Sequence, residues 1–292
     1  MNKKYKFILM LLIVLFAISS YFFIKEIAEN KKENNIYEDL QEIVKNEENS
    51  IQENDYTNAS EDKSDNISTE NNTNPDDFYN LENISKINTD VIGWIKINGT
   101  NINYPIMYHY DNYYLDYGFE GEKLTSGAIY TTNNAKSQNM VITGHNSRVS
   151  VAKFYWLHNI RDVNLGLNNS CYEKNNLSLS KEVMPNFENK EDRIWYVSLY
   201  GITGKWEIFS MYETDVDESP ETIYYNTWDN GYDFKDSNSI YEWINNQISR
   251  SDYDFGTLPN VNDQFLTVYT CSCQYYDEEN ESRLYYFLRK IT

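Results

Sequence analysis

The sequence predicts a mainly β fold with peripheral helices, closed into a barrel and preceded by an N-terminal transmembrane helix and a disordered linker. Three observations predict it. Short runs rich in β-branched and aromatic residues recur between turn residues through the C-terminal part of the 292-residue chain. Few segments in that part have helical periodicity, and many short strands with few helices are typical of a closed β-barrel. An uncharged apolar run lies near the N-terminus.

The apolar run follows a short basic stretch. Residues 1–6 contain three lysines, and residues 7–24 carry no charge. The apolar run would form about 27 Å of helix, close to the hydrocarbon thickness of a bilayer. Lysines before the span favour a cytoplasmic N-terminus, a single-pass anchor and an extracellular location for the rest. The alternative is a cleaved signal peptide, for which Ala17-Ile18-Ser19 is a faint cleavage site.

Residues 25–77 are predicted to be an acidic, Asn-rich linker or stalk. From residue 26 onward this segment holds 16 acidic residues against four lysines. Sparse apolar residues at near-helical spacing over 26–55 leave both a helical stalk and a solvated tether open. Residues 56–77 are almost wholly Asn, Ser, Thr, Asp and Glu, which cannot bury enough apolar surface to fold. We therefore expect the folded domain to occupy residues 78–292.

Charge and cysteine content exclude some functions. The formal net charge is −20, and no basic stripe interrupts the acidic exterior, which argues against nucleic-acid binding. Three cysteines are too few for a disulfide framework, and an odd number outside the membrane leaves one thiol free unless it pairs between chains.

Within the folded domain, the patterns predict alternating hairpins and a few helices. Residues 162–190 are Asn-rich and weakly periodic. The predicted helices cover residues 81–87, 149–159 and 237–250, and the predicted strands cover residues 91–97, 101–107, 127–131, 139–143, 194–200, 205–214, 264–271 and 284–291.

Two of these strands end at reactive side chains. The strand at 264–271 ends at Cys271, and Arg283 follows 12 positions later. The strand at 139–143 continues into Gly144-His145. A thiol, an imidazole and a guanidinium brought together supply a nucleophile, its proton partner and an oxyanion stabiliser.

These residues resemble a known family. Thr267-Val268-Tyr269-Thr270-Cys271 followed by Arg283 resembles the sortase signature, and Gly144-His145-Asn146 resembles the sortase histidine segment. Residues 90–106 and 111–115 resemble class B sortases. The resemblance spans roughly residues 78–292 and implies a closed, sortase-type, eight-stranded β-barrel. Residues 162–190 look longer than the corresponding connection in class B sortases, so we interpret them as an insertion.

The resemblance also implies a function. A class B-like sortase cleaves the C-terminal sorting signal of a surface protein and transfers the acyl group to an amine of the cell wall, carried by peptidoglycan or a lipid-linked precursor. Cys271 would form the thioacyl intermediate, His145 would transfer protons and Arg283 would stabilise the oxyanion. Leu115 and Thr270, together with the helix at 237–250, would line a groove for a peptide of the Asn/Ser-Pro-x-Thr type. No metal or organic cofactor is expected.

Several alternatives remain open from the sequence. Cys273 is expected to face the same way as Cys271 in an extended strand, so it is a second thiol, and a zinc site at this Cys-x-Cys is a weak possibility. Arg289 competes with Arg283, because alternation places both on one face. His109 and His158 are interpreted as packing or surface residues. The alternative functions are a pilin-polymerising sortase, a catalytically silent sortase-like binding module and a cysteine peptidase that only hydrolyses.

Overall fold

The computed structural model describes residues 3–56, 81–133, 136–147, 152–167, 184–215, 234–272 and 282–292. The chain divides into two compact units, Met1–Glu42 and Ile43–Thr292. Cys171, Cys273, residues 57–77 of the predicted linker, residues 78–80 of the predicted folded domain and most of the predicted insertion lie outside the described residues.

The N-terminal region forms one helix, α1 (Lys3–Tyr56). Its most apolar stretch has a mean hydropathy of 2.7, so among the described helices it is the one that is long and apolar enough to cross a membrane. An N-terminal signal sequence would meet the same criteria of length and composition. Because the helix continues to Tyr56, the helical-stalk interpretation fits residues 26–55.

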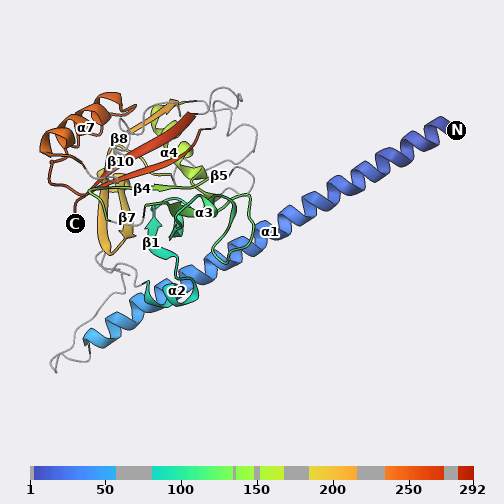
Figure 1. The fold of residues 1–292 in the computed structure, drawn as a ribbon, viewed down its shortest axis with the longest axis horizontal. Coiled ribbons are helices and arrows are strands. Elements are labelled where there is room, and N and C mark those ends of the chain that lie inside the picture. The colour runs from blue at the N-terminus through green and yellow to red at the C-terminus, as the bar shows by residue number, and fades with distance from the viewer. Residues whose placement is uncertain are drawn as a thin grey trace, which may run out of the picture. The chain divides into compact units, whose positions relative to one another are not determined.

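The C-terminal unit contains a closed barrel of eight strands in the order β1-β2-β3-β4-β9-β10-β8-β7, which confirms the predicted fold class (Figure 1). A separate two-stranded sheet consists of β5 (Asn146–Ser147) and β6 (Ala152–Lys153). The barrel strands are β1 (Val91–Lys96), β2 (Asn103–Tyr108), β3 (Ile129–Thr131), β4 (Asn139–Thr143), β7 (Ile194–Leu199), β8 (Ile202–Asp215), β9 (Phe265–Cys271) and β10 (Ser282–Lys290).

Helix α7 (Ser237–Arg250) has the bounds that the sequence predicts, and it packs against β8 and β10 (Figure 1). The side chain of Asp236 caps it by accepting a hydrogen bond from the Ser239 N–H at 2.8 Å. Its apolar face buries Trp243 in a cluster with aromatic side chains of β8, β9 and β10. Because α7 covers one face of these strands and the barrel interior covers the other, β9 is buried on both faces for most of its length.

The shorter helices are α2 (Glu82–Ile87), α3 (Tyr113–Asp116), α4 (Tyr155–Leu165) and the 3-10 turn η1 (Lys190–Arg193). The prediction of a helix over residues 149–159 is wrong at both ends, because residues 152–153 belong to β6 and α4 continues to Leu165. Gly166 ends α4 with a left-handed φ of 64°. Apolar periodicity underestimates α4 because its last turns bury the polar side chains of Arg161 and Asp162.

Two parallel strand pairs determine where the site lies. Most neighbouring strands in this barrel are antiparallel, but β2 pairs with β3 and β4 pairs with β9 in parallel. The C-terminal ends of β4 and β9 therefore emerge at the same edge of the barrel. These are the two strand ends that carry the predicted histidine and cysteine.

Candidate active site

Cys271 and Arg283 face each other across β9 and β10. The antiparallel register pairs these two residues directly. Nη1 of Arg283 lies 3.3 Å from Sγ of Cys271, and the Cys271 residue is exposed to solvent. The Arg283 guanidinium also lies 5.7 Å from the ring centroid of Tyr269. The spacing of 12 residues seen in the sequence thus becomes a direct contact between a thiol and a permanently charged donor.

His145 lies at the same edge of the barrel. Thr143 of β4 pairs with Tyr269 of β9, so His145 and Cys271 each lie two residues beyond the same register position. Beyond that position the Thr270 hydroxyl donates a hydrogen bond to the Gly144 carbonyl at 2.8 Å. This bond holds the end of β4, and with it the histidine, beside the end of β9.

The ring contact of His145 fixes its tautomer. Nε2 lies 2.9 Å from the Leu115 carbonyl oxygen, which can only accept a hydrogen bond. Nε2 therefore carries the hydrogen, and Nδ1 is the basic nitrogen. Burial lowers the pKa of His145, and the bond to Leu115 acts in the opposite direction without offsetting burial. The imidazole is accordingly neutral at neutral pH.

Leu115 is held in place by α3 and the turn before β3. The Ala128 N–H donates to the Tyr114 carbonyl at 2.8 Å. Gly127 has a φ of 53°, and a Cβ at this position would collide with the carbonyl oxygens of Tyr114 and Leu115. A glycine is thus required where the chain passes the carbonyl that orients His145.

Thr270 and Leu115, the two residues predicted to bind substrate, both lie beside the predicted catalytic residues, but they differ in burial. Leu115 is half-buried, whereas the Thr270 side chain is fully buried and bonded to Gly144. The observed contact of the Thr270 hydroxyl is therefore structural, and a contact of either residue with substrate stays a prediction.

Arg289, the competing arginine, lies six residues further along β10. Its Nη2 is 2.8 Å from Oε2 of Glu207, and its Nη1 is 3.5 Å from Oδ2 of Asp263. Of the two arginines, Arg283 is therefore the one in contact with the Cys271 sulfur.

His158 is a site residue that the sequence analysis missed. Its side chain is buried on α4, and Nε2 lies 2.9 Å from the Cys271 carbonyl oxygen. The Asn146 amide approaches the same oxygen at 3.4 Å. The sequence feature that could have identified it is the spacing of His158, Arg161 and Asp162. This spacing places three polar groups on neighbouring turns of one helix. His109 instead contacts Asp111 at 2.7 Å.

Within the described ranges, no group of three or more His, Cys, Asp or Glu side chains is placed to hold a metal ion. Cys273, the second cysteine of the Cys-x-Cys pair, lies outside those ranges, so its role stays untested.

Comparison with known proteins finds similarity to sortase B proteins in sequence and in structure. No family model matches the chain. Sortase B of Staphylococcus aureus (strain NCTC 8325 / PS 47) is 26% identical over 204 residues, which are 67% of this chain and 68% of that protein. The Clostridium perfringens sortase B structure has a TM-score of 0.55 and 22% identity, and the match covers 73% of this chain and all of that one. A Staphylococcus aureus sortase B–substrate complex has a TM-score of 0.52 and 24% identity over 73% of this chain and 85% of that chain.

Proposed function

We propose that this chain, which resembles class B sortases in sequence and fold, is a membrane-anchored cysteine transpeptidase of the cell surface. It cleaves the C-terminal sorting signal of surface proteins and transfers the acyl group to an amine of the cell wall. The single observation that carries this proposal is the 3.3 Å contact between Arg283 Nη1 and Cys271 Sγ at the strand edge that also carries His145.

In the first half-reaction, Sγ of Cys271 attacks the carbonyl carbon of the scissile peptide bond. The new C–S bond generates a tetrahedral oxyanion, and the planar guanidinium of Arg283 beside the sulfur donates hydrogen bonds to that oxygen. Collapse of the intermediate breaks the C–N bond and leaves a thioester on Cys271.

His145 carries the protons. Nδ1, the nitrogen left free by the Leu115 contact, accepts the thiol proton and delivers it to the departing amine. In the second half-reaction, Nδ1 removes a proton from the incoming amine as that amine attacks the thioester. Cleavage of the C–S bond then expels the Cys271 sulfur, which takes this proton back from Nδ1, so the thiol and the neutral imidazole are both restored.

The proposed substrate and acceptor classes rest on the resemblance to class B sortases, and the apolar helix α1 supports a location at the membrane. A Staphylococcus aureus sortase B with 24% identity has been solved as a substrate complex, which supports the proposal that this fold binds a substrate. An uncleaved α1 anchor would keep the enzyme at the outer membrane surface, where exported proteins and cell-wall precursors meet. We therefore propose a Pro-x-Thr sorting peptide as donor and a peptidoglycan or lipid-linked amine as acceptor.

The test uses the full chain in detergent micelles with a panel of Pro-x-Thr peptides, with and without an amine, read by intact mass. We expect a peptide-sized adduct that is absent from Cys271→Ala and is converted to amide product when the amine is added. Parallel arms with an oligoglycine amine and with a lysine side-chain amine separate cell-wall transfer from pilin polymerisation. An adduct that survives Cys271→Ala, or a thiol that labels normally yet forms no adduct with any peptide, overturns the proposal.

A further inference from the structure

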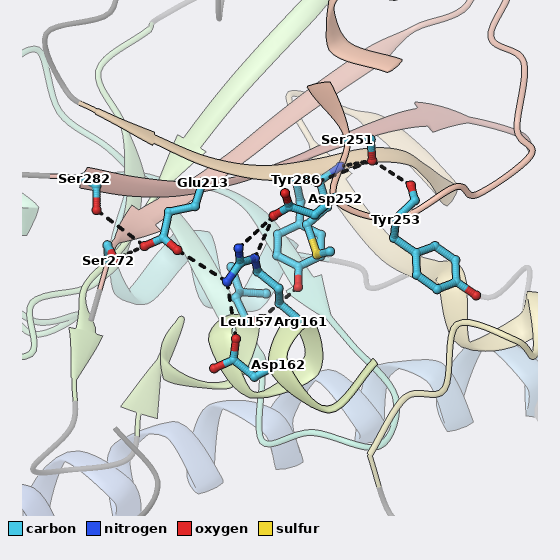
Figure 2. Close-up of polar contacts among 11 residues, drawn as sticks. Leu157, Arg161, Asp162, Glu213, Ser251, Asp252, Tyr253, Ser272, Ser282 and Tyr286 are labelled. Carbon is cyan, nitrogen blue, oxygen red and sulfur yellow. Dashed lines mark hydrogen bonds and ion pairs between the residues drawn. The ribbon is translucent and has the colours of Figure 1, made fainter. Parts of the chain in front are cut away.

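We propose that Glu213, held by Arg161, is a positioning residue that fixes the two strand ends bearing Cys271 and Arg283 (Figure 2). The inference rests on the proposed function of that thiol–guanidinium pair. It concerns a buried ionic cluster behind the site, which the mechanism above does not use.

The cluster joins three elements of the fold around one guanidinium. Arg161 of α4 donates through Nη2 to Asp252, which follows α7, at 2.8 Å, and its Nη1 lies 3.3 Å from Oε2 of Glu213 on β8. Nη1 is also 3.3 Å from Oδ1 of the adjacent Asp162. The side chains of Arg161 and Glu213 are only 10% and 8% exposed. Three carboxylates thus converge on one arginine, as Figure 2 shows.

The second oxygen of Glu213 reaches the active-site strands. Oε1 accepts hydrogen bonds from the hydroxyl of Ser272 and, at 3.4 Å, from that of Ser282. Ser272 directly follows Cys271, and Ser282 directly precedes Arg283. The Ser272 N–H also donates to the Ser282 carbonyl at 2.8 Å. One carboxylate therefore bridges the last described rung of the β9–β10 ladder, one residue from each reactive group.

Glu213 acts from the opposite face of the sheet. Side chains alternate along a strand, so Ser272 and Ser282 point away from the face that carries the thiol and the guanidinium. Tyr285, on the face of Arg283, packs in the α7 cluster, whereas the Tyr286 hydroxyl on the other face donates to the Leu157 carbonyl of α4. Glu213 and Arg161 therefore brace the strand ends from the α4 side and do not touch substrate.

The energetic cost of burying Glu213 and Arg161 indicates that these charged side chains do more than fill space. Burying ions carries a large desolvation penalty, and an apolar cluster of similar volume is often equally stable or more stable. Burial raises the pKa of Glu213, and the neighbouring Arg161 acts in the opposite direction without offsetting it. An apolar side chain at position 213 would fill the space but would leave both serine hydroxyls without this acceptor.

The same strands provide a matched control. Glu207 lies on β8 like Glu213 and binds Arg289 of β10 at 2.8 Å, so it forms a partly buried ion pair that starts from the same strand. It lies in the register pair Arg289↔Glu207, six positions from Arg283 along β10. Replacing Glu207 by Gln removes a comparable ion pair without touching the strand ends at the site.

The experiment compares Glu213→Gln, Ser272→Ala and Glu207→Gln with the parent in the full chain, using transfer kinetics, thermal unfolding and Cys271 alkylation by iodoacetamide. Because misplacement of a reacting group by about 1 Å can cost about 100-fold, we expect kcat for transfer to fall about tenfold to 100-fold in Glu213→Gln and Ser272→Ala. KM should be unchanged. Glu207→Gln should keep the kcat of the parent even if its unfolding temperature falls as much as that of Glu213→Gln.

The outcomes separate the two proposals. Suppose that the parent enzyme transfers normally and that Glu213→Gln and Ser272→Ala have a kcat within about twofold of the kcat of Glu207→Gln. This result overturns the positioning role and leaves the proposed function intact. A parent that forms no thioacyl adduct overturns the proposed function. The alkylation rate of Cys271 still tests positioning in that case, because it needs no substrate. Equal alkylation rates in all four proteins then refute the positioning role, and a slowed rate confined to Glu213→Gln and Ser272→Ala supports it.

Discussion

Replacing Thr270 with Val tests whether this residue acts on the fold or on the substrate. The Thr270 side chain is fully buried, and its hydroxyl donates to the Gly144 carbonyl at 2.8 Å. Valine has nearly the same shape, so the change removes the hydrogen bond and little packing. Leaving a buried carbonyl without its donor costs about 1–3 kcal/mol of unfolding free energy. For a domain of this size, each kcal/mol lowers the unfolding temperature by roughly 2–4 °C.

The activity of Thr270→Val should change in a specific way. Gly144 precedes His145, so loss of the bond releases the end of β4 that carries the imidazole. We expect kcat for transfer to fall by about tenfold or more while KM stays within about twofold. The reason is that the substitution displaces His145, the proposed proton carrier, and removes no substrate contact. Steady-state transfer kinetics and differential scanning fluorimetry on the full chain measure both effects.

The matched control is Thr270→Ser, which keeps the hydroxyl and loses one methyl group. Its stability should fall by about 0.5–1.5 kcal/mol, the usual cost of deleting a buried methyl, and its kcat should remain near that of the parent. A different result would refute the reasoning. If Thr270→Val unfolds at the parent temperature and its defect lies in KM, the hydroxyl serves the substrate instead of Gly144.

Three further predictions concern the other site residues. Arg283→Lys should lower kcat/KM for thioacyl formation by about 100- to 1000-fold, as loss of an oxyanion donor does, because a lysine lacks the planar fork; near-parent rates would exclude the role. Gly127→Ala should cost at least about 1–2 kcal/mol from its positive φ and should displace the Leu115 carbonyl, so a stability loss with unchanged kcat would contradict the link to His145. Burial lowers the pKa of His145 below its ordinary 6.5, so the unfolded chain binds more protons than the folded chain as pH falls through that range. The unfolding free energy of the parent relative to His145→Gln should therefore fall below about pH 6.5, and denaturant titrations showing a rise would refute the assignment.

The sequence predicted those parts of the fold that depend on apolar pattern and turn residues. The strand at 139–143 and the helix at 237–250 match their observed bounds, and the last predicted strands match β9 and β10 within a few residues. In each case an apolar face is buried against the barrel or its covering helix. The spacing of apolar residues in the sequence therefore predicts which face is buried.

The polar support of the site could not be predicted in this way. Helix α4 buries His158, Arg161 and Asp162, which a hydrophobic pattern counts as solvent-facing. Their partners lie on β8, on β9 and after α7, far away in the sequence. Strand alternation alone could not choose between Arg283 and Arg289, since both lie on one face of β10; the resemblance favoured Arg283, and the register pairs Arg283 with Cys271.

The neighbours of Cys271 explain how one exposed thiol is held rigidly at the end of a strand. Strand alternation leaves Cys271 exposed and buries Thr270 and Ser272 on either side of it. Each neighbour donates its hydroxyl to a different partner strand. Thr270 bonds to Gly144 at the end of β4, which leads to the histidine, and Ser272 bonds to Glu213 of β8, which also accepts from the serine before the arginine. The two hydroxyls that flank the sulfur therefore tie it to the histidine-bearing strand on one side and to the arginine-bearing strand on the other, so the relative positions of Cys271, His145 and Arg283 depend on these two buried hydroxyls.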